Sequence, residues 1–283
     1  MTSIVAGIDG SPAQAAVCDA AAWASTGTGL PVTLLHVLEK NEYEGESDLS
    51  GAIGLGSREQ LLEELAELDH RRSRLAQEQG RLLLESAQGY LTGLGVTQVE
   101  TLQRHGQLVE AVQTLSPGMR MMIMGKRGTA HAGDHALIGS HIENVIRTLA
   151  NPIMVVQPGF EAPRRFLFAY DASQAAKKVL ELVAGSPLLK GLACELVMVG
   201  EPSDEHERQL AQARQVLKSA GVEVDARLLQ GEVTPRICQH AAEAGCDLIV
   251  MGAYGHSRIR QFIVGSTTSS LLKATGAAVL LLR

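Results

Sequence analysis

The chain has 283 residues, a formal net charge of −6, 45% apolar residues and 20% charged residues. This length is sufficient for two domains of roughly 140 residues, each with its own core. The acidic balance and an aromatic content of 3% argue against nucleic acid as a partner, because nucleic acids are bound by clustered Lys and Arg and by stacking rings. No apolar stretch approaches the roughly 20 residues of a membrane-spanning helix, so we expect no membrane partner either.

The N-terminal residues and the cysteines indicate the compartment. Residues 1–3 lead directly into the apolar run 4–6, without the basic segment and longer apolar core of a secretory signal. The cysteines are scattered along the chain and lack metal-ligand spacing, which is typical of reduced core residues. They are Cys18, Cys194, Cys238 and Cys246. We therefore expect a cytoplasmic protein.

Short apolar runs alternate with stretches of helical spacing along the whole chain. Continuous apolar runs predict strands that are covered on both faces, and a repeated strand-helix order predicts a parallel sheet. The runs are residues 4–8, 32–37, 99–102, 121–124 and 153–156 in the first half, and 166–170, 196–199, 248–251 and 278–282 in the second. The predicted fold class is therefore α/β with doubly wound parallel sheets.

The two halves carry the same landmarks in the same order. Residues 9–11 (Asp-Gly-Ser) match residues 171–173 (Asp-Ala-Ser), and Met-Gly at 124–125 matches Met-Gly at 251–252. Repetition of this kind predicts an internal duplication. We place the two domains of this tandem repeat at residues 1–158 and 163–283, on either side of a polar linker that contains proline.

Only the first half has a long insertion, at about residues 39–89. Its Arg58–Gly89 part is rich in Leu, Glu, Arg and Gln at the spacing of an amphipathic helix. This helix is either an extended version of the ordinary covering helix or a dedicated partner-binding element.

A glycine-spaced loop follows the fourth predicted strand of the second half. It runs Gly252, two residues, Gly255, nine residues, and then Gly265-Ser266-Thr267. The first two glycines let backbone amides approach a ligand where a Cβ would collide, and the third opens a helix whose N-terminal amides suit phosphate oxygens. The loop is a candidate phosphate site; a plain tight turn is the alternative interpretation.

Two residues at the ends of earlier strands extend this candidate site. Asp171 follows the first strand of the second half, which in a doubly wound sheet lies beside the fourth, where ligands bind. Its carboxylate can accept hydrogen bonds from a ribose or a base, or it can cap the following helix, and Ser173 could share either task. Val199 ends the second strand and offers an apolar contact to a purine.

At these residues the chain resembles the universal stress protein family in its tandem, two-domain form. The resemblance implies two five-stranded Rossmann-like domains of the adenine-nucleotide α-hydrolase type, a stress-response role, and ATP with Mg²⁺, or AMP, as the ligand. It assigns Asp171 and Val199 to the adenosine and the glycine-spaced loop to the phosphates. The candidate binding residues of the second half are Asp171, Ser173, Val199, Met251, Gly252, Gly255, His256, Gly265, Ser266 and Thr267.

The first half departs from this pattern, because ten residues rather than nine separate Gly128 from Gly139. The extra residue is compatible with a harmless bulge and equally with a lost phosphate site. Lys126 and Arg127 replace neutral residues of the second half, and either support phosphate charge or project into solvent. The candidate residues here are Asp9, Val37, Gly125, Gly128, Gly139 and Ser140.

Metal and catalytic signatures are weak. The first-half loop contains ligand-type residues, but the second half has no equivalent set, so we expect solvated side chains and no metal site. These residues are His131, Asp134, His135 and His141. No Ser, His and Asp set suggests a nucleophile with its base, so we assign no catalytic residue.

Three functions remain open. The first is a regulator that binds ATP or AMP, chiefly in the second half, without rapid turnover. The second is a slow ATPase or a self-phosphorylating enzyme that uses Ser266 or Thr267. The third is a nucleotide-independent scaffold that uses the Arg58–Gly89 helix.

The family resemblance also implies how the two halves meet. Single domains of that family pair through their last strands, and a fused chain can do so internally by pairing residues 153–156 with 278–282 in antiparallel fashion. One chain would then be an intramolecular pseudo-dimer. A homodimer of such chains would be a further level of assembly.

Overall fold

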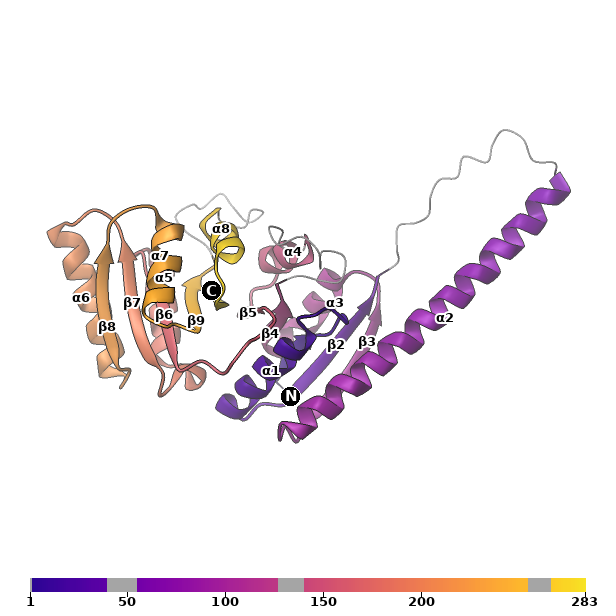
Figure 1. The fold of residues 1–283 in the computed structure, drawn as a ribbon, viewed down its shortest axis with the longest axis horizontal. Coiled ribbons are helices and arrows are strands. Elements are labelled where there is room, and N and C mark those ends of the chain that lie inside the picture. Colours follow the sequence, from indigo (N-terminus) through magenta and orange to yellow (C-terminus); the bar gives the residue numbers. More distant parts are fainter. Residues whose placement is uncertain (1, 40–54, 127–139, 254–265) are drawn as a thin grey trace.

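The computed structural model describes residues 2–39, 55–126, 140–253 and 266–283. They form one ten-stranded sheet with helices on both faces (Figure 1). The strands lie in the order β3-β2-β1-β4-β5-β10-β9-β6-β7-β8. They are β1 (Ser3–Gly7), β2 (Val32–Leu38), β3 (Val99–His105), β4 (Met119–Gly125), β5 (Ile153–Val156), β6 (Arg165–Ala169), β7 (Ala193–Val199), β8 (Val224–Leu229), β9 (Leu248–Gly252) and β10 (Ala278–Leu282).

Each half of the sheet is doubly wound, as the sequence predicts. In the first half (β1–β5) every neighbouring pair is parallel, and β1 lies between β2 and β4. The second half (β6–β10) repeats this arrangement, with β6 between β7 and β9. The halves meet where β5 pairs antiparallel with β10, with Met154 opposite Leu280. The expected antiparallel pairing of the last strands is therefore present.

Eight helices lie within the described ranges and cover both faces of the sheet. They are α1 (Gln14–Thr28), α2 (Leu55–Gly93), α3 (Leu108–Leu115), α4 (Ser140–Thr148), α5 (Gln174–Ala184), α6 (Asp204–Ser219), α7 (Val233–Glu243) and α8 (Ser266–Ala274). Buried residues of α1, α2, α5 and α6 share one hydrophobic cluster, and those of α3, α4, α7 and α8 share the other. None of these helices is long and apolar enough to cross a membrane.

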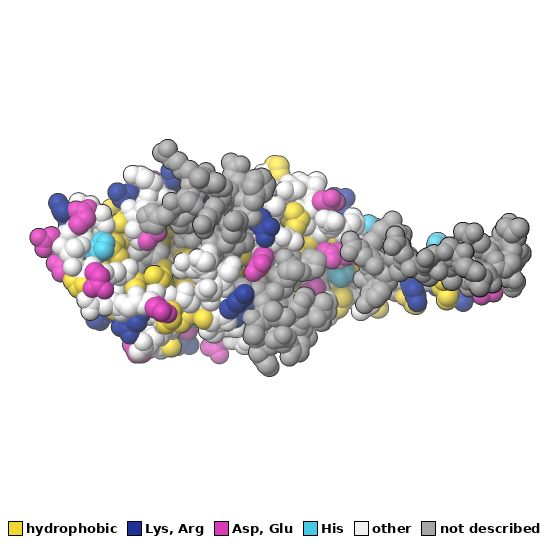
Figure 2. Space-filling model, turned by 90° about the horizontal axis from the view of Figure 1, so that it is seen from above, with side chains coloured by type: hydrophobic (Ala, Val, Ile, Leu, Met, Phe, Trp, Pro, Cys, Tyr) yellow, Lys and Arg dark blue, Asp and Glu magenta, His cyan; other side chains and the backbone are white. Residues whose placement is uncertain are grey.

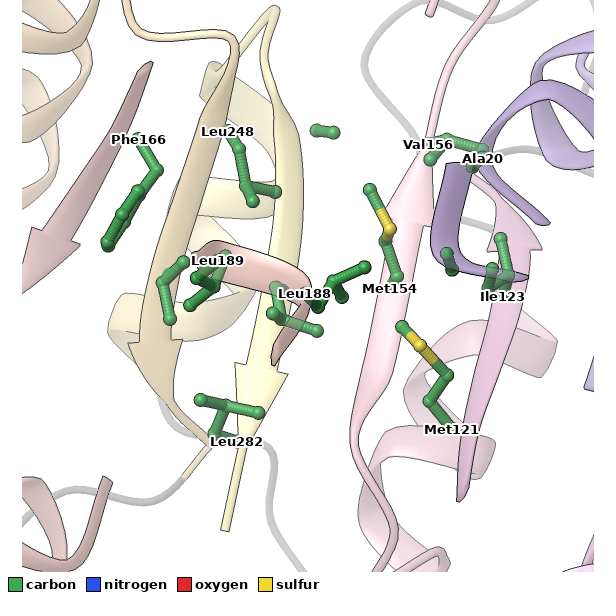
Figure 3. Packing of buried hydrophobic residues seen from close by; sticks show 14 of the residues in the cluster. Ala20, Met121, Ile123, Met154, Val156, Phe166, Leu188, Leu189, Leu248 and Leu282 are labelled. Carbon is green, nitrogen blue, oxygen red and sulfur yellow. The ribbon is translucent and has the colours of Figure 1, made fainter. Parts of the chain in front are cut away.

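Both hydrophobic clusters continue across the junction of the two halves. Successive side chains of a strand point to opposite faces, so β5 contributes Met154 to one cluster and Val155 to the other. On the first face, the 3-10 helix Pro187–Leu189 packs on α1, and a Cβ added to Gly27 would lie 3.4 Å from Leu188 Cδ1. Figure 3 shows Leu188 on the side of the second half that faces Met154. Apolar packing therefore supports the strand pairing at the junction.

The insertion helix, α2, is longer than the predicted Arg58–Gly89. Its C-terminal part packs on the sheet through Leu84, Ala87 and Leu91, all buried. At Gly80 it approaches β2 so closely that a Cβ would lie 2.5 Å from His36 Cδ2. This glycine therefore allows close packing rather than breaking the helix. The N-terminal part of α2 extends beyond the sheet (Figure 1).

The cysteines provide a test of the packed core. Burial raises the pKa of the Cys18 thiol to about 11 and that of Cys246 to about 12, and it raises the pKa of Cys194 well above its usual range. Cys238 is half-buried, and the charge of Lys126 opposes the effect of burial on its pKa. We expect a thiol reagent at pH 8 to label at most Cys238 in the native protein and all four cysteines after unfolding.

The same shifts predict a loss of stability in alkali. The folded-state pKa values lie above the unfolded value of about 9, so the contribution to stability is complete below pH 9 and disappears as the pH rises through 11 to 12. Urea unfolding between pH 8 and pH 11 measures this decline.

In the labelling experiment, rapid reaction of more than one thiol of the native protein at pH 8 would contradict the packing described above.

Candidate functional site

The winding of the second half reverses between β6 and β9. These strands are parallel neighbours, with Ala169 opposite Met251, and the pairing continues on the other side of β6, where Tyr170 N donates to Val197 O (2.9 Å). The segments that follow β6, β7 and β9 therefore leave the sheet at one edge. This edge is where ligands bind in doubly wound sheets.

Most described candidates of the second half lie along this edge. Asp171 is exposed, Val199 and Gly252 are half-buried, and Met251 is buried beneath them. Helix α8 leads directly into β10, which is parallel to β9, so the N-terminus of α8 points towards the same edge. Its first residues, Ser266 and Thr267, are exposed there.

The turn after β6 assigns different tasks to Asp171 and Ser173. Asp171 Oδ1 accepts a hydrogen bond from Ser173 N (3.0 Å), and Ser173 Oγ accepts one from Ala176 N (3.1 Å). Ser173 therefore caps α5, whereas Asp171 holds the turn with its carboxylate at the surface. Between them, Ala172 has φ +57°, a left-handed conformation that no other non-glycine residue in the described ranges adopts.

The first half has the same turn after β1. Asp9 Oδ1 accepts a hydrogen bond from Ser11 N (3.0 Å), and Gly10 has φ +73°. Val37 and Gly125 are half-buried near the ends of β2 and β4, as Val199 and Gly252 are in the second half. The backbone geometry of the first strand's turn is thus common to both halves.

The surroundings of the two turns differ. Helix α2 lies against the first one, and a Cβ on Gly10 would be 3.4 Å from both Cδ atoms of Leu83. Ser11 is buried, and its Oγ has no hydrogen-bond partner among the described residues. Ser11 is therefore more deeply buried than Ser173, whereas Asp9 is exposed, as Asp171 is.

Several candidate residues cannot be placed. Gly255, His256 and Gly265 of the second half, and Gly128 and Gly139 of the first, lie outside the described residues. The predicted His and Asp cluster of the first-half loop falls largely in the same gap, and Ser140 is the first residue of α4. Within the described ranges, no group of three or more His, Cys, Asp or Glu could hold a metal ion.

Lys126 does not project into solvent, one of the two roles that the sequence suggested. Its side chain is buried, and its Nζ donates to the carbonyl oxygens of Lys273 (3.2 Å) and Thr275 (3.0 Å), at the C-terminus of α8. The ammonium group thus meets carbonyls that a helix end leaves unpaired, and it does not project into solvent. The aligned residue in the second half, Ala253, is a small apolar residue and is also buried; its residue type was the one signal in the sequence that position 126 is buried.

Comparison with known proteins identifies the fold and the family. The model of the universal stress protein family matches residues 1–157 and 195–283. The chain belongs to the universal stress protein family. The match omits residues 158–194, so the assignment of Asp171 depends on the turn that it shares with Asp9 rather than on the family model.

Full-length relatives of this universal stress protein are known. Universal stress protein Slr1230 of Synechocystis is 33% identical over 287 residues, which cover 100% of each chain. A universal stress protein from Archaeoglobus fulgidus has a similar crystal structure, with a TM-score of 0.72 at 20% identity over 99% of this chain and 96% of that one. A Pseudomonas aeruginosa protein of unknown function, PA1789, has a TM-score of 0.62 at 14% identity over 100% and 92%. The two solved structures support the tandem fold.

We expect Lys126→Met to destabilise this universal stress protein. The substitution leaves the Lys273 and Thr275 carbonyls without their charged donor, and such hydrogen bonds are worth about 1.5–3 kcal/mol, so the free energy of unfolding should fall by about 2 kcal/mol. Urea denaturation measures the change. Lys177→Met, on the exposed side of α5, is the control. A cost no larger than that of the control would contradict the proposed capping of α8.

The turns after β1 and β6 should respond to substitution in opposite directions. A left-handed backbone costs a non-glycine residue roughly 1–2 kcal/mol, and the extra entropy of an unfolded glycine offsets roughly half of this, so Ala172→Gly should stabilise the protein by about 0.5 kcal/mol. Gly10→Ala should destabilise it by about 0.5 kcal/mol, for the same reason. Thermal unfolding of both variants measures the two changes in melting temperature. Shifts of the same sign in the two variants would refute the prediction.

Proposed function

We propose that this protein binds an adenine nucleotide, ATP or AMP, chiefly in its second half, and acts as a nucleotide-dependent regulator in the cytoplasmic stress response. The observation that carries the proposal is that the exposed carboxylate of Asp171 and the exposed N-terminus of α8 open at the same edge, where the winding of the sheet reverses. The four cysteines, all unpaired, fit a reducing compartment.

The candidate site has two ends, one suited to an adenosine and the other to phosphates. Asp171 can accept hydrogen bonds from ribose hydroxyls, and half-buried Val199 can contact the flat face of a purine. Ser266 and Thr267 combine hydroxyl donors with the unpaired amides of a helix N-terminus, which suit phosphate oxygens, with Mg²⁺ when the ligand is ATP. Gly252 lies between these ends and presents no side chain to a ligand.

Three differences favour the second half over the first. Leu83 of α2 lies against Gly10, and Ser11 is buried where the matching Ser173 is only half-buried. Its glycine-spaced loop is one residue longer. Lys126, one of the two cations in that loop, is engaged with the C-terminus of α8, and the other, Arg127, lies outside the described residues.

Calorimetry of the full chain with ATP and with AMP, with and without Mg²⁺, tests the proposal. We expect about one nucleotide per chain, bound in the second half. Asp171→Ala should weaken binding by at least about 10-fold, because a hydrogen bond to a charged group is worth about 1.5–3 kcal/mol. Asp9→Ala is the matched control and should leave this affinity unchanged. Absence of binding by the unsubstituted protein would refute the proposal, whereas two nucleotides per chain would extend it to the first half.

A second variant separates ligand contact from folding. A Cβ added to Gly252 would lie 3.7 Å from Val179 Cγ2, its nearest described neighbour and an ordinary contact distance. Gly252→Ala should therefore preserve the free energy of unfolding but weaken nucleotide binding, because the added methyl occupies the space of the ligand. Unchanged affinity in this variant would place the nucleotide away from β9.

A further inference from the structure

The projecting part of α2 carries an exposed stripe of leucines that the proposed nucleotide site does not use. The leucine stripe consists of Leu65, Leu68, Leu75 and Leu82, which are 41%, 47%, 71% and 52% exposed. All residues from 63 to 75 are exposed, so this segment, about 20 Å long, has no cover from any described part of the chain.

Three of the four leucines in the stripe face away from the sheet. The residues by which α2 packs on the sheet begin with buried Gly80 and Leu84. At about 100° per residue, Leu68, Leu75 and Leu82 lie about 120°, 140° and 160° around the helix from Gly80, on the side away from the sheet. Leu65 lies about 60° from Gly80, at the flank of the stripe. Leu68, Leu75 and Leu82 also recur every seven residues, which keeps them within about 40° of one another around the helix. Packing within the described chain therefore does not explain the stripe.

The charges beside the stripe are divided along the helix. Segment 63–69 contains Glu63, Glu64, Glu67 and Asp69 and no Lys or Arg, whereas segment 71–74 contains Arg71, Arg72 and Arg74 and no Asp or Glu. Figure 2 shows hydrophobic and charged side chains interspersed along the projecting helix. Along this part of α2, an acidic segment (63–69) is thus followed directly by a basic segment (71–74).

The separation of acidic and basic segments along α2 indicates what kind of helix can pack on it and in which orientation. A parallel copy of the helix would set acidic against acidic and basic against basic. An antiparallel copy centred near residue 70 sets segment 63–69 along residues 71–77 of the other chain, which include the basic segment 71–74. It places Leu65 opposite Leu75 and Leu68 opposite Arg72. The ion pairs within one helix, Arg71–Glu67 at 3.5 Å and Arg72–Asp69 at 3.6 Å, are largely exposed and contribute little, so they compete weakly with such contacts.

We propose that the leucine stripe of α2 is a homodimerisation surface, on which a second copy of this chain docks its own α2 in antiparallel orientation. This surface is separate from the β5–β10 junction, which the two halves of one chain already occupy. It is also independent of the proposed nucleotide site, which lies in the other half of the chain.

Sedimentation equilibrium of the full chain tests the assembly. We expect a species of twice the 30.1 kDa mass of one chain. The double variant Leu68→Glu/Leu75→Glu should be monomeric with unchanged helix content, because both side chains are exposed and Glu forms helices well. Leu182→Glu/Val216→Glu, at comparably exposed positions of α5 and α6, should remain dimeric. A monomeric unsubstituted chain, or a dimer that survives the stripe variant, would overturn the proposal.

Two further measurements test the direction. Oxidation of a mixture of Leu65→Cys and Leu75→Cys proteins should cross-link one to the other, whereas each protein alone should cross-link little. Efficient cross-linking of either protein with itself would indicate a parallel pair and contradict the proposal. The native cysteines interfere little, since three are buried and Cys238 is half-buried.

Charge reversal provides the last test. The triple variants Arg71→Glu/Arg72→Glu/Arg74→Glu and Glu63→Arg/Glu64→Arg/Glu67→Arg should each be monomeric, because each makes the two segments alike in charge. Their equimolar mixture should form a heterodimer. If the mixture stays monomeric while the unsubstituted chain dimerises, charge complementarity does not direct the pairing.

Discussion

The antiparallel pairing of β5 with β10 determines how the whole molecule is organised. Each half alone would end in an apolar strand with unpaired backbone groups, an arrangement that promotes association. Pairing these strands joins two parallel sheets into one and makes the hydrophobic cluster on each face continuous. It also brings the end of β4 next to the start of β10, which is why Lys126 can reach Thr275.

The same pairing separates the two candidate sites. Because β5 and β10 run in opposite directions, the carboxyl ends of the strands in one half lie beside the amino ends in the other. The turns at Asp9 and Asp171 therefore open on opposite edges of the sheet. Helix α2 extends from the first-half edge, and its Leu83 lies against Gly10, so the projecting helix and the first-half turn are in contact. The turn at Asp171 stays exposed on the other edge.

Local patterns predicted the fold well, because buried parallel strands produce continuous apolar runs and duplication repeats landmarks such as Asp9 and Asp171. The left-handed Ala172 could also have been predicted, since the aligned residue is Gly10. The contact of Lys126 with Thr275 could not, because it joins residues 149 positions apart and depends on the final packing of the two halves. The prediction for α2 differed from the structure only at its ends, because helix termini depend on a few local contacts that the apolar periodicity does not encode.

Lys126 also shows what covalent fusion permits. In a dimer of identical single-domain chains, every residue at the junction occurs twice, so a lysine that fits one side must be tolerated on the other. Here the two positions have diverged: a buried lysine caps α8 on one side, and the buried Ala253 occupies the other. Joining the copies in one chain has thus released the junction from symmetry, and each half can specialise without imposing the same change on its partner.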